Sequence, residues 1–309
     1  MTQAAVAIPS LWQQAVQGEF TGVDGVTLRY AHLPNPFARG TVVIASGRSE
    51  GYLKYDGLAE DLHKSGLEVF IWDHRGQGLS DRLSSNRFLG HVQRFEHYVE
   101  DMHTFMTQVV QPSNPKKLYL VGHSMGGAIG TLYILAHPGV FDAAVFSAPM
   151  YGIQLPGPRW VLQPVLSMLA SWNRWQGKPG YIPGGTDYQP IPFEENALTQ
   201  DPERYQAFQA LYQQVPQLQL GSPSNHWMME SFDAMDRIKQ QAHKLSTPTL
   251  VMQAGQDVIV DNQAMEQVVA LGKNMQLIAL SDARHELLVE IPSIRDRVLS
   301  AITQWLDKH

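Results

Sequence analysis

Short runs of hydrophobic residues recur along this chain, with stretches of helical pattern between them. Runs such as TVVIA and KLYLV are apolar at successive positions, which is typical of strands covered by helices on both faces of a parallel sheet. In the run 26–31, polar Thr27 and Arg29 alternate with apolar residues, which favours an antiparallel edge strand. The expected strands span residues 26–31, 41–45, 67–72, 118–121, 143–146, 249–252 and 275–280.

Patterns with a period near 3.6 residues predict helices between these strands. The final helix has Pro292 in its first turn and an apolar stripe that includes Ile294, Val298 and Ile302. Alternation of strands and helices predicts an α/β protein with a mostly parallel sheet. The expected helices span residues 55–65, 95–110, 125–136, 262–271 and 292–307.

The alternation stops between residues 150 and 245, where the sequence is rich in Pro and Trp and contains no convincing strand. We therefore expect residues 1–149 and 246–309 to form the α/β core and residues 150–245 to be an insertion. Within it, Pro164 is expected to interrupt any long helix over the apolar stretch 160–175.

Composition removes several classes of function. The chain of 309 residues has no Cys, which excludes disulfides, thiolate metal sites and a cysteine nucleophile. Its net charge of −6 and its lack of a long basic run argue against nucleic acid as a partner. Residues 1–12 do not resemble a secretory signal, and no apolar run approaches the roughly 18 residues of a membrane span. A cytoplasmic location is expected, with peripheral contact at the inner face of the membrane left open.

One motif carries candidate chemistry. Residues 122–126 read Gly-His-Ser-Met-Gly, the G-x-S-x-G pattern of a nucleophile elbow, between an expected strand and an expected helix. A sharp turn that exposes Ser124 requires small Gly122 and Gly126 on either side, because neighbouring backbone must approach closely. The alternative is a glycine-rich turn with a bystander serine. The context favours Ser124 as a nucleophile.

A serine nucleophile needs a histidine base and an acid that orients it, in the chain order Ser, acid, His for this motif. Asp257 follows an expected strand, and His285 follows the next one. Asp261 is the second candidate for the acid. Asp282 is less suitable because it shares a short loop with the histidine that it would orient.

Motifs for metals and cofactors are incomplete. His285 and Glu286 begin like H-E-x-x-H, but Val289 replaces the second histidine, so no metal is expected. Gly76-Gln77-Gly78 lacks the third glycine of a dinucleotide fingerprint, and no cofactor is expected. In the same DHRGQG segment, His74 is expected to organise a loop.

With these residues placed, the chain resembles the α/β-hydrolase superfamily, and within it the monoacylglycerol-lipase and bacterial lysophospholipase branch. The bacterial lysophospholipases resemble it most. Among the segments that carry the resemblance are SGRSEGYLKY, DHRGQGLSDR, GHSMGGAI, TPTLVMQAGQDVIVDN and HELLVE. The resemblance implies a mostly parallel eight-stranded sheet flanked by helices, with residues 150–245 as an inserted, mainly helical lid. It also implies oxyanion donors at the backbone N–H groups of Arg48 and Met125.

The implied activity is hydrolysis of the carboxylic ester of a single-chain lipid, a lysophospholipid before a monoacylglycerol, through a Ser-His-Asp acyl-enzyme mechanism. A small amphiphilic lipid is the expected partner, and a general carboxylesterase is an alternative. An amidase or peptidase would need a site for an amine, for which the Glu194-Glu195 pair is a weak candidate. A hydrolase-fold protein that binds lipid without turnover is the non-enzymatic alternative.

The apolar stretch 160–175 bears on the substrate, because it can bury an acyl chain, touch a membrane or simply form the internal core of the lid. Arg48 is a candidate contact for a phosphate if its side chain faces the pocket. The candidate residues of the acyl or lid pocket are Trp160, Leu166, Met168, Trp172 and Trp227.

Overall fold

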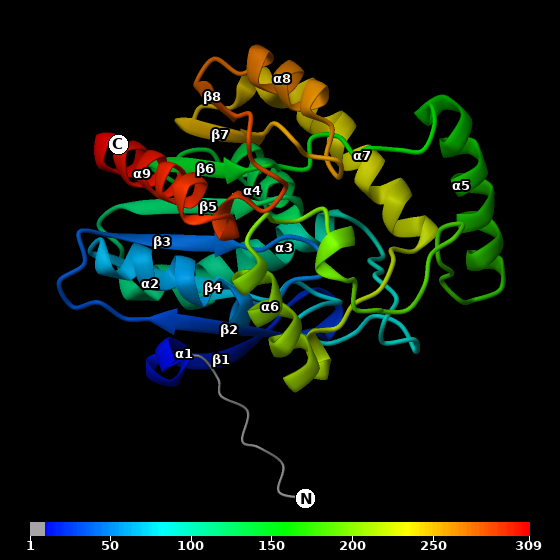
Figure 1. The fold of residues 1–309 in the computed structure, drawn as a ribbon, viewed down its shortest axis with the longest axis horizontal. Helices are drawn as coiled ribbons and strands as arrows, with labels where there is room; N and C mark the ends of the chain where they lie inside the picture. Colours follow the sequence, from blue (N-terminus) through cyan, green and yellow to red (C-terminus); the bar gives the residue numbers. More distant parts are fainter. Residues whose placement is uncertain (1–9) are drawn as a thin grey trace, which may run out of the picture.

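A single sheet of eight strands organises the computed structural model, which describes residues 10–309 (Figure 1). Residues 1–9, on which much of the prediction about a signal sequence rests, lie outside the described residues. The strand order is β1-β2-β4-β3-β5-β6-β7-β8. The strands are β1 (Val16–Thr21), β2 (Thr27–Leu33), β3 (Gly40–Ala45), β4 (Leu67–Trp72), β5 (Leu118–His123), β6 (Ala143–Ser147), β7 (Thr249–Ala254) and β8 (Met275–Leu280).

Every neighbouring pair from β4 to β8 in this order is parallel, whereas β2 pairs antiparallel with both β1 and β4. The antiparallel direction expected for residues 26–31 is therefore right, but their place at the edge is wrong. The edge strand is β1, which the sequence pattern missed. In β1 only Phe20 is buried, so the strand lacks the apolar run that marks its neighbours.

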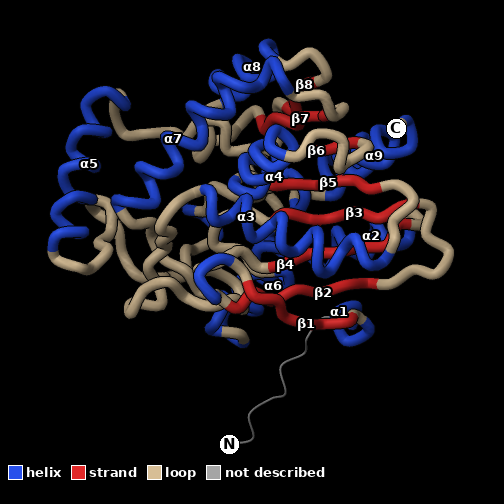
Figure 2. Tube along the Cα trace, turned by 180° about the vertical axis from the view of Figure 1, so that it is seen from behind, coloured by secondary structure: helices blue, strands red, loops and turns tan. Residues whose placement is uncertain are grey.

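Helices cover both faces of the sheet (Figure 2). Val43 of β3 packs into one core cluster together with residues of α3, α4 and α7, whereas Val42 and Ile44 pack into a second cluster with α2 and α9. Burial on both faces explains the unbroken apolar run of this strand. The helices are α1 (Ser10–Gln14), α2 (Asp56–Lys64), α3 (Glu96–Phe105), α4 (Met125–Ala136), α5 (Arg159–Trp175), α6 (Pro202–Gln214), α7 (Asn225–Gln241), α8 (Asn262–Leu271) and α9 (Pro292–Lys308).

The segment 150–245 contains α5, α6 and α7 and contributes no strand to the sheet. Helix α5 packs along α7 at a distance from the sheet (Figure 1). The expected interruption at Pro164 is wrong, since α5 is one helix with this proline inside it. Pro164 lies in the second turn, where the hydrogen bond that it cannot donate would end on Trp160 in the first turn, so the later turns keep their bonds.

Candidate active site

The backbone turns sharply at Ser124, between the end of β5 and the start of α4. Its φ of 51° and ψ of −116° are unusual for a residue with a side chain. A Cβ at Gly126 would lie 2.1 Å from the carbonyl oxygen of Ala45, and one at Gly122 would lie 2.9 Å from the ring of Phe146. Both glycines are therefore needed for the close approach that the sequence predicted.

Loops after β7 and β8 bring Asp257 and His285 to this turn. His285 Nε2 lies 3.1 Å from Ser124 Oγ, and His285 Nδ1 lies 2.7 Å from Asp257 Oδ2. The other carboxylate oxygen accepts the backbone N–H groups of Ile259 at 2.8 Å and Val260 at 3.0 Å. Burial raises the pKa of Asp257, but the hydrogen bonds, above all that from His285, outweigh burial and hold the pKa below its ordinary value. All three predicted residues therefore meet in one hydrogen-bonded chain.

The two other candidate acids are occupied elsewhere. Asp261 caps α8 by accepting the N–H groups of Gln263 and Ala264. Asp282 pairs with Arg297 through both carboxylate oxygens, at 2.8 and 2.6 Å. Neither makes a hydrogen bond to His285.

Two backbone N–H groups near Ser124 lack obvious partners. Met125 is the first residue of α4, so its N–H has no acceptor inside the helix. In the loop after β3, the N–H of Gly47 donates to Glu50 Oε2 at 2.6 Å. The next N–H, that of Arg48, donates no hydrogen bond within residues 10–309. These are the two groups expected to bind an oxyanion.

The segment after β4 holds this loop in place. His74 Nε2 donates to the carbonyl of Ser46 at 3.1 Å, and burial lowers the pKa of His74 to about 4, so the ring is neutral. Gln77 Nε2 donates to the carbonyls of Gly47 at 2.7 Å and Glu50 at 2.9 Å. The loop-organising role expected of His74 matches this contact. Sequence reasoning missed Gln77, although it stands in the same DHRGQG segment.

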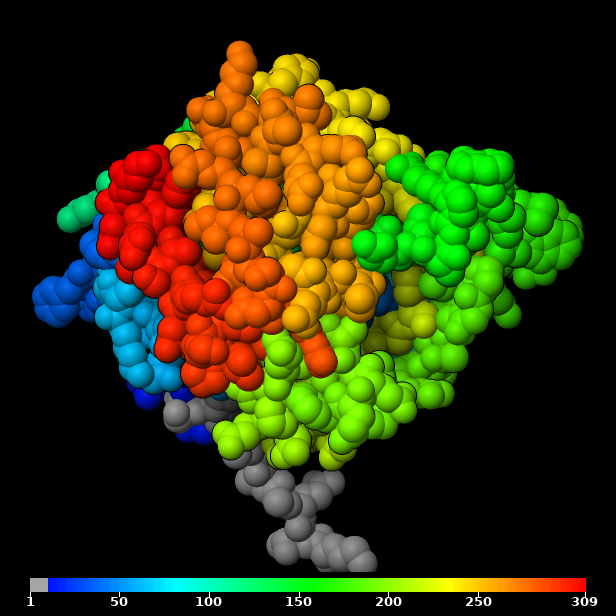
Figure 3. All heavy atoms as spheres, turned by 45° about the horizontal axis from the view of Figure 1, so that its top comes forward, coloured from blue at the N-terminus to red at the C-terminus, as the bar shows by residue number. Residues whose placement is uncertain are grey.

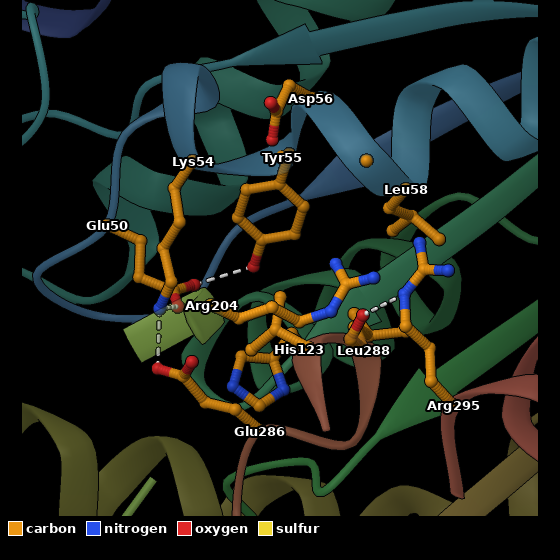
Figure 4. Close-up of a pocket in the computed structure, with 12 residues that line it drawn as sticks. Glu50, Lys54, Tyr55, Asp56, Leu58, His123, Arg204, Glu286, Leu288 and Arg295 are labelled. Carbon is orange, nitrogen blue, oxygen red and sulfur yellow. Dashed lines mark hydrogen bonds and ion pairs between the residues drawn. The ribbon is translucent and has the colours of Figure 1, made fainter. Parts of the chain in front are cut away.

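A buried ion cluster, which we call the Glu50–Lys54–Glu286 bridge, lines the same cavity as Ser124 and His285. Figure 4 shows its three side chains together, with His123 nearby. Lys54 Nζ is 2.6 Å from Glu50 Oε1 and 2.5 Å from Glu286 Oε1. Tyr55 donates its hydroxyl to Glu50 Oε2 at 2.6 Å. Burial raises the pKa of both carboxyl groups, but Lys54 overcomes this effect at Glu50 and lowers its pKa to about 2, whereas the pKa of Glu286 stays raised.

The bridge joins the loop before α2 to the loop that carries His285. Its two carboxylates, Glu50 and Glu286, line the same cavity as Ser124 and His285. His123 lines the same cavity, with its ring centroid 4.9 Å from that of His285, and burial lowers its pKa to about 4. Sequence reasoning missed all three bridge residues. The signals present were the four-residue spacing of Glu50 and Lys54 and the position of Glu286 next to the histidine.

A cavity of about 440 Å³ opens above Ser124, within the range usual for small-molecule sites. Its polar part includes Ser124, His285, the Glu50–Lys54–Glu286 bridge, His123 and Arg48. Most other lining side chains are apolar and come from α6, α7, the connection between α5 and α6, and the loops after β6 and β7. They include Met150, Ile153, Leu155, Ile182, Leu198, Phe208, Trp227, Met228, Ile259 and Val260.

Of the five residues predicted for an acyl or lid pocket, Trp227 alone lines this cavity. Leu166 is buried in the core cluster that includes α7, and it is not a lining residue. Trp160, Met168 and Trp172 are 79%, 66% and 54% exposed and do not line the cavity, so their prediction as pocket residues is wrong. The apolar pattern could not distinguish a pocket from an open surface, because the position of α5 on α7 decides which side is covered.

Known proteins share this sequence and architecture. The family model described as serine aminopeptidase, S33, matches residues 36–292. Lysophospholipase L2 of Escherichia coli strain K12 is 37% identical, over 98% of this chain and 90% of that protein. Monoacylglycerol lipase of Mycolicibacterium smegmatis is 29% identical, over 94% of this chain and 96% of that protein. A solved soluble variant of monoglyceride lipase from Saccharomyces cerevisiae has the same fold, with a TM-score of 0.76, 21% identity and 98% of each chain covered.

Proposed function

This chain belongs to the family described as serine aminopeptidase, S33, with the α/β-hydrolase fold, and we propose that it is a lysophospholipase that cleaves the ester of a single-chain phospholipid. The observation that carries the proposal is the hydrogen-bonded chain of Ser124, His285 and Asp257 at a largely apolar cavity. The identity of 37% with a lysophospholipase supports the same reading. The resemblance predicted from the sequence is confirmed.

The proposed chemistry is acyl transfer in two steps. His285 Nε2 takes the proton of Ser124 Oγ as this oxygen attacks the ester carbonyl, and Asp257 stabilises the imidazolium through Nδ1–H. The imidazolium then protonates the leaving alcohol, and the acyl group stays on Ser124. Water, deprotonated by His285, releases the fatty acid. The N–H groups of Arg48 and Met125 hold the oxyanion, where losing one donor costs about 10² to 10³ in rate.

The cavity favours a lipid over a peptide amine. A peptidase that trims an N-terminus needs a free carboxylate for the substrate ammonium. Glu194 and Glu195 lie in an exposed turn and do not line the cavity. Glu50 and Glu286 do line it, but Lys54 bridges both. The apolar lining instead suits one acyl chain.

We propose that residues 150–245 act as the lid of this site. Phe208 of α6 and Trp227 and Met228 of α7 line the cavity, so this segment encloses the substrate opposite the elbow. The core then comprises, of the residues that the structure describes, 10–149 and 246–309.

The outer face of α5 is the proposed contact with the membrane surface. Its exposed apolar side chains include Met168, Trp172 and Trp175, the last of which is 77% exposed. The segment that contains α5 projects from the side of the molecule (Figure 3). Trp-rich faces of this kind insert shallowly at bilayer interfaces. No helix within residues 10–309 has both the length and the apolar content needed to span a bilayer.

The proposal is tested by fatty-acid release from lysophosphatidylcholine, lysophosphatidylethanolamine and monoacylglycerol of the same chain length. Ser124→Ala serves as the blank, and we expect it to lower kcat by roughly 10⁶ with the fold intact. Release from lysophospholipids supports the proposal. Release from monoacylglycerol alone would make the protein a monoacylglycerol lipase, and undiminished activity of Ser124→Ala would remove the serine mechanism.

A further inference from the structure

The guanidinium of Arg48 is a cation without a carboxylate partner at the catalytic cavity. Nη2 donates to the carbonyl of Gly221 at 2.5 Å, and Nη1 donates to the hydroxyl of Ser49 at 3.1 Å. Nε is buried and has no hydrogen-bond partner. Within residues 10–309 no Asp or Glu pairs with this side chain, so neutral groups alone contact the charge. Burial lowers the pKa of Arg48 to about 10, which still leaves it charged at neutral pH.

The fully buried cations of the described chain are neutralised, whereas Arg48 is half-buried. Lys54, in the same cavity, lies between Glu50 and Glu286. Arg75 binds both carboxylate oxygens of Asp101, at 2.5 and 2.7 Å. Half-buried Arg82 and Arg284 also contact carbonyl groups without a carboxylate partner, but unlike Arg48 they do not line the catalytic cavity. A buried charge is costly without a partner of opposite sign. An anionic ligand at Arg48 would therefore supply the negative charge that the protein itself does not place there.

Packing holds the guanidinium in one place. Its Cζ lies 5.3 Å from the ring centroid of Trp227, over the ring face. Gly90 approaches from another side, because a Cβ there would lie 2.4 Å from Nη2. A side chain restrained before binding loses little entropy when a ligand arrives. The site is thus preorganised for a planar donor to meet an anion.

The covalent geometry of a lysophospholipid fits this position. Six covalent bonds separate its ester carbon from phosphorus, and since each bond of an extended chain advances about 1.25 Å along it, the span is roughly 7 to 7.5 Å. An extended arginine side chain spans a similar distance, roughly 6 Å, from Cα to Cζ. The backbone N–H of Arg48 is the proposed oxyanion donor. One residue can therefore hold the carbonyl with its backbone and the phosphate with its side chain.

We propose that the side chain of Arg48 binds the phosphodiester of the substrate and gives the enzyme its preference for lysophospholipids over monoacylglycerols. This inference rests on the proposed function. Charge-assisted hydrogen bonds from a guanidinium are the strongest that a phosphate receives in proteins. The acyl chain then occupies the apolar side of the cavity, and the head group lies toward Gly90 and Gly221.

The test is the ratio of kcat/KM for lysophosphatidylcholine to that for monoacylglycerol of the same chain length, measured in identical detergent micelles. We expect Arg48→Met to lower this ratio by roughly 10- to 100-fold, as befits loss of a charged hydrogen bond. A disturbance of the loop after β3, which carries the proposed oxyanion donor, should slow both substrates equally and therefore leave the ratio unchanged. Arg48→Lys keeps the charge and should recover part of the preference.

Two further variants distinguish the position of the Arg48 guanidinium from a general effect of lost positive charge. Gly90→Ala leaves the loop of Arg48 unchanged but displaces the guanidinium, so it should lower the ratio in the same direction. Lys116→Met removes an exposed positive charge and should leave the ratio unchanged. An unchanged ratio in Arg48→Met, or an equal fall in Lys116→Met, overturns the proposal. If the wild-type protein hydrolyses neither lipid, the proposed function fails instead.

Discussion

Removing the central charge of the Glu50–Lys54–Glu286 bridge should destabilise the protein in a pH-dependent way. Lys54→Met keeps the length of the side chain and deletes Nζ, which lies 2.6 Å from Glu50 and 2.5 Å from Glu286. All three side chains are at most 8% exposed. The variant therefore leaves two carboxylates in one buried space without a cation, and their repulsion raises the pKa of one of them.

The expected loss is about 3 to 5 kcal/mol in the free energy of unfolding at pH 8, the cost typical of breaking a buried ion pair. In the wild type, the pKa of Glu50 is lowered from 4.5 to about 2, so its contribution is complete above pH 4.5 and lost as the pH falls toward 2. In the variant, the folded-state pKa of the carboxylate pair is raised, so stability is lost as the pH rises through that value. The difference between the two proteins should therefore widen from pH 5 to pH 8.

Urea unfolding followed by tryptophan fluorescence at both pH values measures this difference. Lys64→Met is the matched control, because Lys64 forms an ion pair of the same spacing with Glu60 on the surface, and it should change stability little at either pH. Lys54→Met combined with Glu286→Gln removes one of the stranded carboxylates and should regain much of the loss. A pH-independent difference between wild type and Lys54→Met would refute the electrostatic account, as would an equal loss in Lys64→Met.

Two further predictions concern the acid and the membrane face. Asp257→Asn should lower kcat about 10⁴-fold in steady-state assays, as the equivalent change does in other serine triads. The control, Asp261→Asn, should leave kcat unchanged, because Asn caps a helix as well as Asp does. Equal effects of the two substitutions would contradict the assignment of Asp257 as the acid. Trp172→Ser combined with Trp175→Ser should weaken cosedimentation with phospholipid vesicles at least about 10-fold, since each ring is exposed in the free protein. Phe37→Ser, at an exposed loop residue, is the control and should bind as the wild type does.

Local patterns sufficed for much of the fold. Four of the expected segments have the predicted bounds in the structure, namely β4, β8, α4 and α8. These segments carry their signal within themselves, as continuous apolar runs or as amphipathic periods between turn residues. The elbow was equally readable, because strand, Gly-x-Ser-x-Gly and helix are contiguous in the sequence.

Features that depend on distant neighbours could not be predicted. Strand β1 has one buried side chain, Phe20, and its edge position follows from pairing with β2. The face that α5 leaves exposed depends on how it packs against α7. Lys54 and Glu286 are separated by 232 positions, and the sequence around neither residue predicts the ion pair. The sequence therefore indicated the reacting groups better than the groups that hold them.

This division has a physical basis in the active site. Ser124 owes its position to a local turn. The loop after β3, with the proposed oxyanion donor Arg48, and the loop with His285 come from chain segments far apart, and buried polar contacts link them. Glu50 binds the N–H of Gly47 in the oxyanion loop and, through Lys54, reaches Glu286 beside His285. Because such groups are buried, each lost partner leaves another charge unsatisfied. Fixed positions on both sides of the serine are what transition-state stabilisation requires, since donors that must reorient during reaction contribute less. We therefore expect the Glu50–Lys54–Glu286 bridge to affect catalysis through position, without contact with the reacting atoms.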